Sequence, residues 1–153
     1  YGSNCDAFHM TAPDPTGEGA ATAMQLALAE AKIEPAQVDY INAHGTATKA
    51  NDAAEAKAIN LVFGEDSKVL VGSTKAMTGH LLGAAGAIEA IAVVASLQKG
   101  QLPVNIGMTE QDKECKVNVV TQAKAHPEKL EYALSNSLGF GGHNAVLAFR
   151  KWS

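Results

Sequence analysis

The sequence predicts an α/β fold in which helices cover a mixed β-sheet, and two observations lead to this prediction. Segments of helical composition alternate along the chain with short apolar segments, a pattern typical of layered α/β domains. The last two apolar segments are separated only by a glycine turn at residues 139–142, so the strands they predict should pair antiparallel. The chain has 153 residues, which suits one compact domain with a sizeable core.

The first predicted helix spans residues 18–31, where the strong helix formers Ala, Leu, Met and Gln predominate. Pro35 marks the exit from this helix, because proline cannot continue one. Residues 38–42 then predict a short strand. The chain opens at Tyr1 without a methionine, in what we interpret as part of another strand, so we expect it to belong to a longer protein.

A second helix is predicted from Ala53 to about Phe63. Asn and Asp at residues 51–52 can cap its start, and Gly64 can end it. Residues 68–71 predict the next strand, and residues 73–80 form a polar loop that leads into the longest apolar segment.

That longest segment, residues 81–98, predicts a helix that ends at Gly100. It is apolar all round, so we expect it to be buried. It is about a turn short of the ~20 residues of a membrane span, and Glu89 near its middle would be costly in lipid. A buried carboxylate needs a hydrogen-bonded partner, a cation or a proton, so a structural ion pair and a functional role for Glu89 are equally open.

The remaining segments are less regular until the end of the chain. Residues 103–120 have no clear period, whereas residues 132–137 and 145–150 predict the two final strands. The turn between these strands could cradle a phosphate, close a hairpin or act as a hinge. It does not open a helix and lacks the dinucleotide fingerprint, which argues against nucleotide binding.

Composition narrows the function classes. Hydrophobic residues make up 46% and charged residues 18%, as in ordinary globular proteins. The net charge of -4 gives no sign of nucleic-acid or anionic-membrane binding. Cys5 and Cys115 are too few for a disulfide framework, and no secretory signal is visible, so we expect a cytoplasmic protein with reduced thiols.

Polar residues collect at three predicted strand ends, residues 42–48, 73–80 and 136–144. Loops that leave the same edge of a sheet can converge on a pocket. His44 and His80 lie in two of these Gly- and Thr-rich loops and are candidates for chemistry. Structural roles are the default for the remaining histidines, which are His9, His126 and His143. A zinc site of His44, His80 and Glu89 is conceivable by ligand type, but no HExxH or CxxC spacing supports it.

As a set, three motifs resemble the β-ketoacyl-acyl-carrier-protein synthases, and most closely the bacterial type II elongation enzymes. The motifs are NAHGTAT (residues 42–48), STKAMTGHLLGAAG (73–86) and SNSLGFGGHN (135–144). The resemblance covers essentially the whole chain, in the same order and at compatible spacings. The segment DAFHMT at residues 6–11 also resembles the strand-to-loop entry of that family.

The resemblance implies catalytic roles for His44, His80 and Lys75. The two imidazoles would face the thioester carbonyl, assist the loss of CO2 from a malonyl group and stabilise the enolate. Lys75 would be a fixed positive charge that organises the histidine loop. Glu89 matches a buried carboxylate of the long helix, which in some members helps to hold a monovalent cation near Ser135 and Asn136. No other metal is implied.

The resemblance also implies substrate-binding residues. Thr46 and Thr48 match hydroxyls that bind the amides of the phosphopantetheine arm, which the acyl carrier protein delivers. No organic cofactor is implied beyond this arm. Phe140 matches a gating aromatic whose backbone N–H completes an oxyanion hole. The glycines around it (Gly139, Gly141 and Gly142) would let the gate move, because they tolerate positive φ. Thr11 would line the malonyl end of the pocket, and His9 is a weaker candidate.

The implied architecture is the C-terminal half of the thiolase fold, with a five-stranded mixed sheet covered by helices over residues 1–153. The nucleophilic cysteine of the family lies in the preceding half, and neither Cys5 nor Cys115 matches it. The chain alone should therefore be inactive, and the parent should be a cytoplasmic homodimer that condenses malonyl-acyl carrier protein with an acyl primer. Two alternatives stay open: a polyketide-type ketosynthase, and a non-catalytic partner subunit such as a chain-length factor.

Overall fold

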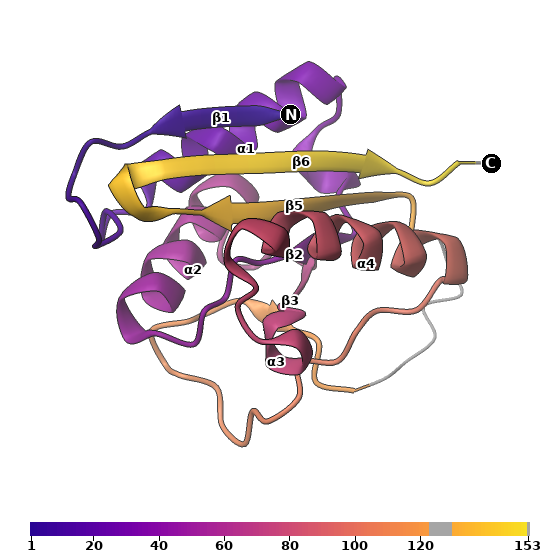
Figure 1. The fold of residues 1–153 in the computed structure, drawn as a ribbon. Coiled ribbons are helices and arrows are strands. Elements are labelled where there is room, and N and C mark those ends of the chain that lie inside the picture. The colour runs from indigo at the N-terminus through magenta and orange to yellow at the C-terminus, as the bar shows by residue number, and fades with distance from the viewer. Residues whose placement is uncertain (123–129, 153) are drawn as a thin grey trace.

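The computed structural model describes residues 1–122 and 130–152 and contains a six-stranded sheet in the order β1-β6-β5-β2-β3-β4 (Figure 1). The strands are β1 (Gly2–Cys5), β2 (Tyr40–Asn42), β3 (Leu70–Gly72), β4 (Asn118–Val119), β5 (Tyr132–Leu138) and β6 (His143–Arg150). The predicted mixed α/β fold is confirmed. The predicted count of five strands is wrong by one, because the irregular segment before residue 120 adds the two-residue β4 at one edge.

Strand direction divides the sheet into two parts. β2 pairs parallel with both β3 and β5, and β3 pairs parallel with β4. β6 runs antiparallel between β5 and β1, as the short glycine turn predicts. The carboxyl ends of β2, β3 and β5 therefore lie along one edge of the sheet, where α/β folds place their sites.

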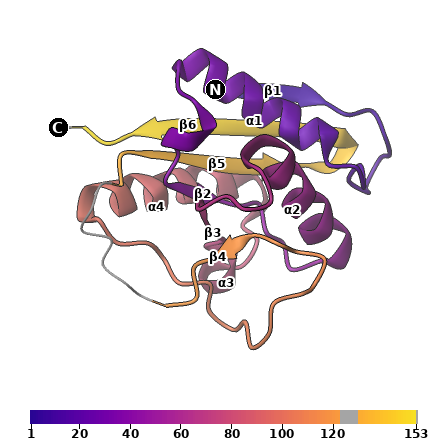
Figure 2. The same cartoon turned by 180° about the vertical axis from the view of Figure 1, so that it is seen from behind.

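The longer helices cover both faces of the sheet. These are α1 (Glu18–Ala31), α2 (Lys49–Phe63) and α4 (Ala85–Lys99), and a short α3 (Lys75–Thr78) precedes α4. Figures 1 and 2 show α1 and α2 on one face and α4 on the other. Side chains alternate between the two faces along a strand, so neighbouring residues of β2 contribute to different hydrophobic cores. Ile41 packs in the cluster under α1 and α2, whereas Tyr40 packs against Val93 and Leu97 of α4.

Element boundaries agree closely with the prediction in some places and differ in others. α1 has the predicted bounds, whereas α2 begins at Lys49, four residues before the predicted start, with no side-chain hydrogen bond at its N-cap Thr48. The polar loop at residues 73–80 contains α3. The long helix starts at Ala85 rather than residue 81, because Leu82 adopts a φ of 50° and opens a 3-10 turn.

The expectation that the long helix is buried on every side is wrong. Glu89, Val93 and Leu97 of α4 are buried, but Ile88, Ile91 and Val94 are 39%, 66% and 41% exposed. The stretch Leu82–Lys99 is also long and apolar enough to cross a membrane, judged by length and composition alone. The helix therefore packs one side on the sheet and leaves an apolar side uncovered in this chain.

Candidate active site

Two of the three polar loops meet at the carboxyl edge of the sheet. One follows β2 and carries His44; the other follows β3 and carries His80. The two imidazole rings lie edge to face, with centroids 5.3 Å apart and planes 83° apart. The predicted convergence of these loops is thus observed, although the residues are 36 positions apart in the sequence (44 and 80).

The hydrogen bond that His80 makes determines its tautomer. Its Nδ1 accepts the backbone N–H of Leu82 at 3.1 Å, so Nδ1 carries no proton and the neutral ring must be protonated at Nε2. The side chain is exposed at the end of the α3 loop. His80 therefore presents an N–H donor to whatever occupies the space beside His44.

His44 is held by its backbone and kept neutral by its surroundings. The residue is only 8% exposed, and its backbone N–H donates to Glu55 Oε1 at 2.8 Å. Burial, then the positive charge of Lys75, then the neighbouring His80 together lower the pKa of His44 from 6.5 to about 4. A neutral imidazole is thus available at physiological pH.

This low pKa predicts a loss of stability in acid. An unfolded chain binds a proton at His44 near pH 6.5 and the folded chain only near pH 4, so the unfolded state holds more protons between these values and is favoured as the pH falls. At about 1.4 kcal/mol for each pKa unit, we expect the free energy of unfolding to fall by roughly 3 kcal/mol across this window. Denaturant titrations between pH 7 and pH 4 measure it. A His44→Gln variant should show a flatter profile, and an equally steep one would contradict the assignment.

Lys75 and Glu89 form an ion pair beneath the histidines. Lys75 Nζ contacts Glu89 Oε1, and both side chains are almost completely buried. Of the two open interpretations of Glu89, the structural ion pair is therefore observed. The other carboxylate oxygen, Oε2, lacks a hydrogen-bond partner among the described residues. Burial and then the charge of Glu89 raise the pKa of the Tyr40 hydroxyl, so Tyr40 stays neutral.

Glu55 is a site residue that the sequence analysis missed. Its buried carboxylate accepts the backbone N–H groups of His44 at 2.8 Å and Gly45 at 2.9 Å, and the side-chain amide of Asn136 at 3.1 Å. Burial raises the pKa of Glu55, while these hydrogen bonds favour its ionised form. Glu55 thus joins the loop after β2 to β5. Its position on the alanine-rich buried side of α2, between Ala54 and Ala58, was a signal that could have identified it.

A cleft of about 540 Å³ opens beside the catalytic candidates, lined by Thr46, Lys75 and His80 among others. The hydroxyls of Thr46 and Thr48 lie 3.0 Å apart at the N-terminal end of helix α2. Two adjacent hydroxyls of this kind can donate to or accept from an amide-bearing ligand. The cleft and the hydroxyls therefore offer space and polar contacts next to the imidazoles.

The glycine turn after β5 is anchored to the segment that follows β1. The Gly141 N–H donates to Met10 O at 2.7 Å, and the Asp6 N–H donates to Gly142 O at 2.9 Å. Gly141 and Gly142 adopt φ near +78°, which only glycine tolerates freely, whereas Gly139 is extended. The predicted positive φ is thus observed at Gly141 and Gly142 but not at Gly139. Phe140 is 77% exposed at the tip.

Comparison with known proteins agrees with this geometry. Residues 1–109 match the family model "Beta-ketoacyl synthase, C-terminal domain". The chain belongs to the β-ketoacyl synthase family. This ketoacyl synthase chain is 52% identical to the 3-oxoacyl-[acyl-carrier-protein] synthase 2 of Staphylococcus aureus strain COL. The match covers 99% of this chain and 37% of that relative. It thus corresponds to little more than a third of that relative.

Two solved structures are similar in fold. The ishigamide ketosynthase/chain length factor superposes with a TM-score of 0.93 at 39% identity, over 99% of this chain and 37% of that one. The ketosynthase AntDE in complex with the type II polyketide acyl-carrier protein AntF superposes with a TM-score of 0.94 at 35% identity, with the same coverages. The thiolase-like fold expected of a ketoacyl synthase is thereby confirmed.

The other histidines that the structure describes, His9 and His143, have structural surroundings. His9 Nδ1 accepts the backbone N–H groups of Thr11 and Ala12, both at 3.1 Å, so His9 orders a turn. Thr11 itself is exposed in this turn, beside the anchor of the glycine turn at Met10, and its pocket role stays a prediction. His143 begins β6 and accepts the Gly139 N–H through its backbone carbonyl. His126 lies outside the described residues.

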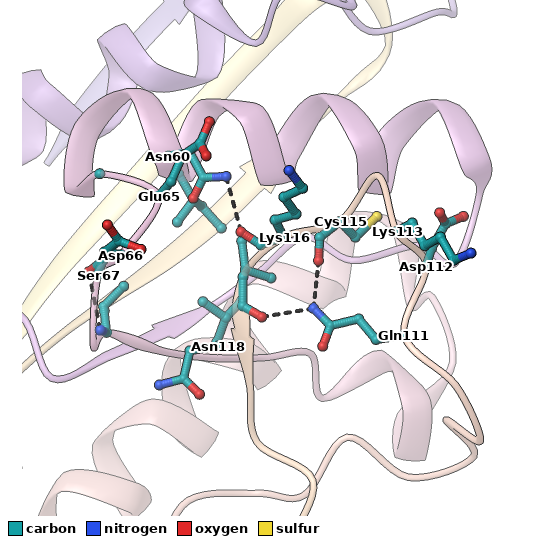
Figure 3. A pocket seen from close by; sticks show the side chains of 15 residues that line it. Asn60, Glu65, Asp66, Ser67, Gln111, Asp112, Lys113, Cys115, Lys116 and Asn118 are labelled. Atoms are coloured by element: carbon teal, nitrogen blue, oxygen red, sulfur yellow. Dashed lines mark hydrogen bonds between the residues drawn. The ribbon is translucent and has the colours of Figure 1, made fainter.

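The two cysteines have different surroundings. Cys5 donates through its thiol to Gly141 O at 3.1 Å, so it contributes to the anchor of the glycine turn. Cys115 lines the cleft that also contains Lys75 and His80. It also lines an adjoining groove of about 700 Å³ between the end of α2 and residues 111–118, where Asn60 donates to Lys116 O and Gln111 to Val117 O (Figure 3). Burial, with nearby carboxylates, raises the pKa of Cys115. An activated nucleophile needs a lowered pKa, so Cys115 is not one.

The oxygens around Glu89 fit a hard cation better than a transition metal. Ser135 and Asn136 are buried on β5. The Asn136 amide donates to Glu55 Oε1 on the face covered by α1 and α2, so its side chain points away from Glu89 of α4. Glu89 Oε2 has no hydrogen-bond partner among the described residues. Carboxylate, hydroxyl and amide oxygens suit hard cations. Within residues 1–122 and 130–152, no group of three or more His, Cys, Asp or Glu side chains could hold a metal, which argues against the zinc site of His44, His80 and Glu89.

Proposed function

We propose that this domain supplies the His44, His80 and Lys75 part of the active site of a fatty-acid elongation enzyme. The reaction joins malonyl-acyl carrier protein to an acyl thioester and yields 3-oxoacyl-acyl carrier protein and CO2. The observation that carries the proposal is the pair of imidazoles, 5.3 Å apart, of which one presents an Nε2–H and the other is neutral. The 52% identity to a 3-oxoacyl-[acyl-carrier-protein] synthase 2 supports elongation over other condensations.

In the proposed mechanism, the bond between the malonyl carboxylate carbon and the α-carbon breaks, and CO2 leaves. The bonding electrons form an enolate whose oxygen accepts hydrogen bonds from His80 Nε2–H and from the imidazole of His44. The α-carbon then attacks the acyl thioester carbonyl, and the C–S bond breaks to release a thiolate. Donors fixed in advance at the developing charge stabilise such a transition state strongly. The acyl thioester would be formed on a cysteine in a part of the protein that precedes this domain.

Lys75 contributes charge rather than proton transfer in this scheme. Its ammonium is paired with Glu89 in a buried position, so it is a fixed cation close to His44 whose charge lowers the His44 pKa. A neutral His44 still carries one ring N–H, which can donate to the enolate oxygen. The Thr46 and Thr48 hydroxyls would bind the amides of the phosphopantetheine arm in the adjacent cleft.

The test is radiolabelled CO2 release from malonyl-acyl carrier protein by the full-length protein that contains this domain, with an acyl primer. Primer-dependent release with a 3-oxoacyl product is the expected result. A folded protein that binds the carrier without releasing CO2 would instead identify a non-catalytic partner subunit. The presence of both imidazoles argues against that outcome, because a binding module has no need of them.

A polyketide-type ketosynthase is the second candidate. The ketosynthases with a chain length factor or a polyketide carrier protein have TM-scores of 0.93 and 0.94, but their identities of 39% and 35% are lower than that of the elongation relative. Both candidates would use the same histidines and lysine. Product analysis with saturated and with 3-oxoacyl primers separates them: preference for saturated primers supports elongation.

Replacing Phe140 with alanine should slow acyl transfer while the fold is retained. Phe140 is exposed between Gly139 and Gly141, so its loss removes an exposed aromatic side chain without opening a core cavity. If it positions the incoming acyl chain, we expect the acylation rate to fall on the order of tenfold. Trp152→Ala is the matched control, because Trp152 is exposed beyond the far end of β6. Equal acylation rates in the two variants would contradict the gating role proposed for Phe140.

We also propose that the preceding part of the protein covers the apolar side of α4. Ile88, Ile91 and Val94 form an exposed apolar strip, and such strips mark interaction sites. The family resemblance further implies a cytoplasmic homodimer. Sedimentation of the full-length protein measures whether it is a dimer. Dye binding to exposed apolar surface should be strong for the isolated chain and weak for the full-length protein.

A monovalent cation is proposed near Glu89, Ser135 and Asn136. The unpartnered oxygen Glu89 Oε2 would be satisfied by it. It would supply positive charge that stabilises the buried carboxylate, without taking part in bond making. Thermal unfolding in potassium, sodium and a bulky organic cation tests this: identical midpoints in all three would exclude the site.

A further inference from the structure

We propose that Ser73 is a positioning residue that bridges the loop carrying His44 to the loop carrying Lys75. Its hydroxyl donates to Gly45 O at 3.2 Å and accepts the Lys75 backbone N–H at 3.4 Å. Gly45 directly follows His44, and Lys75 begins α3. A single side-chain oxygen thus contacts the backbone of both loops. This inference rests on the proposed function and extends it to a residue that lines the same cleft as Lys75 and His80.

The chemistry of a hydroxyl suits this bridge. A serine hydroxyl has one proton to donate and lone pairs to accept, so both contacts can be made together. Alanine can make neither. Ser73 is itself fixed at its backbone, because its N–H donates to Asn105 Oδ1 at 3.2 Å. The bridge is therefore anchored to a third segment, which follows α4.

Close packing adds a steric reason for glycine at position 45. Gly45 has a φ of +45°, and a Cβ built on it would lie 2.6 Å from Ser73 Cβ, a separation that real Cβ atoms do not show. The two loops therefore touch directly here, and Gly45 leaves just enough room for the Ser73 side chain.

The backbone of Gly45 is held from two sides. Its N–H donates to Glu55 Oε2 at 2.9 Å, and its carbonyl accepts from Ser73. Glu55 fixes the loop after β2 to helix α2, whereas Ser73 fixes the same loop to the one after β3. Two other hydrogen bonds also join these loops, from Ala43 N–H to Gly72 O at 2.8 Å and from Thr74 N–H to Asn42 Oδ1 at 3.3 Å. Removing the Ser73 hydroxyl leaves these and the tie to α2, but takes away the contact that holds the residue next to His44. Small errors of placement between catalytic groups can lower rates substantially.

The test compares Ser73→Ala with Ser67→Ala in the full-length protein. Ser67 is a suitable control because its hydroxyl accepts the Val69 N–H at 3.2 Å, a local contact at the opposite end of β3 that joins no two loops. For Ser73→Ala we expect kcat for CO2 release from malonyl-acyl carrier protein to fall on the order of tenfold with KM unchanged. For Ser67→Ala we expect wild-type kinetics.

Amide hydrogen exchange supplies a readout that does not depend on turnover. Exchange in residues 43–48 should be faster in Ser73→Ala than in the wild type, and unchanged in Ser67→Ala. Unchanged exchange in Ser73→Ala would overturn the bridge, and faster exchange with wild-type kcat would overturn its role in positioning. A wild-type protein that releases no CO2 would contradict the proposed function, while the exchange rates would still decide whether Ser73 holds the two loops together.

Discussion

His80→Ala is expected to reduce the rate of CO2 release from malonyl-acyl carrier protein by about 10²–10³-fold, the range typical for loss of one donor to a developing oxyanion. The reason is geometric. The Leu82 N–H occupies His80 Nδ1, which leaves Nε2–H as the donor that faces the space beside His44. Alanine removes this donor. Single-turnover CO2 release by the full-length protein measures the effect.

A glutamine at position 80 is the matched variant, because its side-chain amide also carries N–H donors. We expect His80→Gln to retain more activity than His80→Ala. His80 is exposed, so neither change should alter the unfolding midpoint much. Wild-type CO2 release by His80→Ala would contradict the assigned role, and a large drop in stability would show that the activity loss has another cause.

Glu89→Leu is expected to have the largest effect on stability. The change leaves the Lys75 ammonium buried without its counter-ion, and removing one partner of a buried ion pair typically costs about 3–5 kcal/mol. Denaturant unfolding of the full-length protein measures this loss. Lys75 can escape part of the cost by losing its proton, in which case the loss of stability should be smaller at high pH.

The double variant Lys75→Met with Glu89→Leu separates stability from catalysis. Replacing both charges by apolar side chains of similar size is often neutral or stabilising, so most of the lost stability should return. CO2 release should remain low, because the fixed positive charge near His44 is gone. Recovery of activity together with stability would show that the pair serves only the fold.

Several features followed from local chemistry and could be predicted from the sequence. The bounds of α1 were predicted because helix formers fill residues 18–31 and Pro35 follows. The meeting of His44 and His80 could be predicted because both follow parallel strands, and such strands end at one edge of a sheet. Local composition determines the first feature and general topology the second.

Other features depend on contacts that no local pattern encodes. Helix α4 starts at Ala85 rather than at the predicted residue 81, because Leu82 takes a left-handed conformation, which its residue type does not favour. Glu55 was missed because its partners are backbone N–H groups of residues 44 and 45, ten or more positions away. The exposed side of α4 could not be predicted from composition, because exposure depends on which surfaces cover a helix.

The order of the strands has a consequence for how the domain is made. β6 is the last strand of the chain, yet it lies between β5 and β1, and among the described residues it is the only strand that pairs with β1. During translation, β1 and the side of α1 that packs on β6 therefore remain unpaired until β6, the last strand, has been synthesised. Contacts between residues so distant in sequence slow folding. The emerging chain thus exposes an unpaired edge that chaperones could recognise.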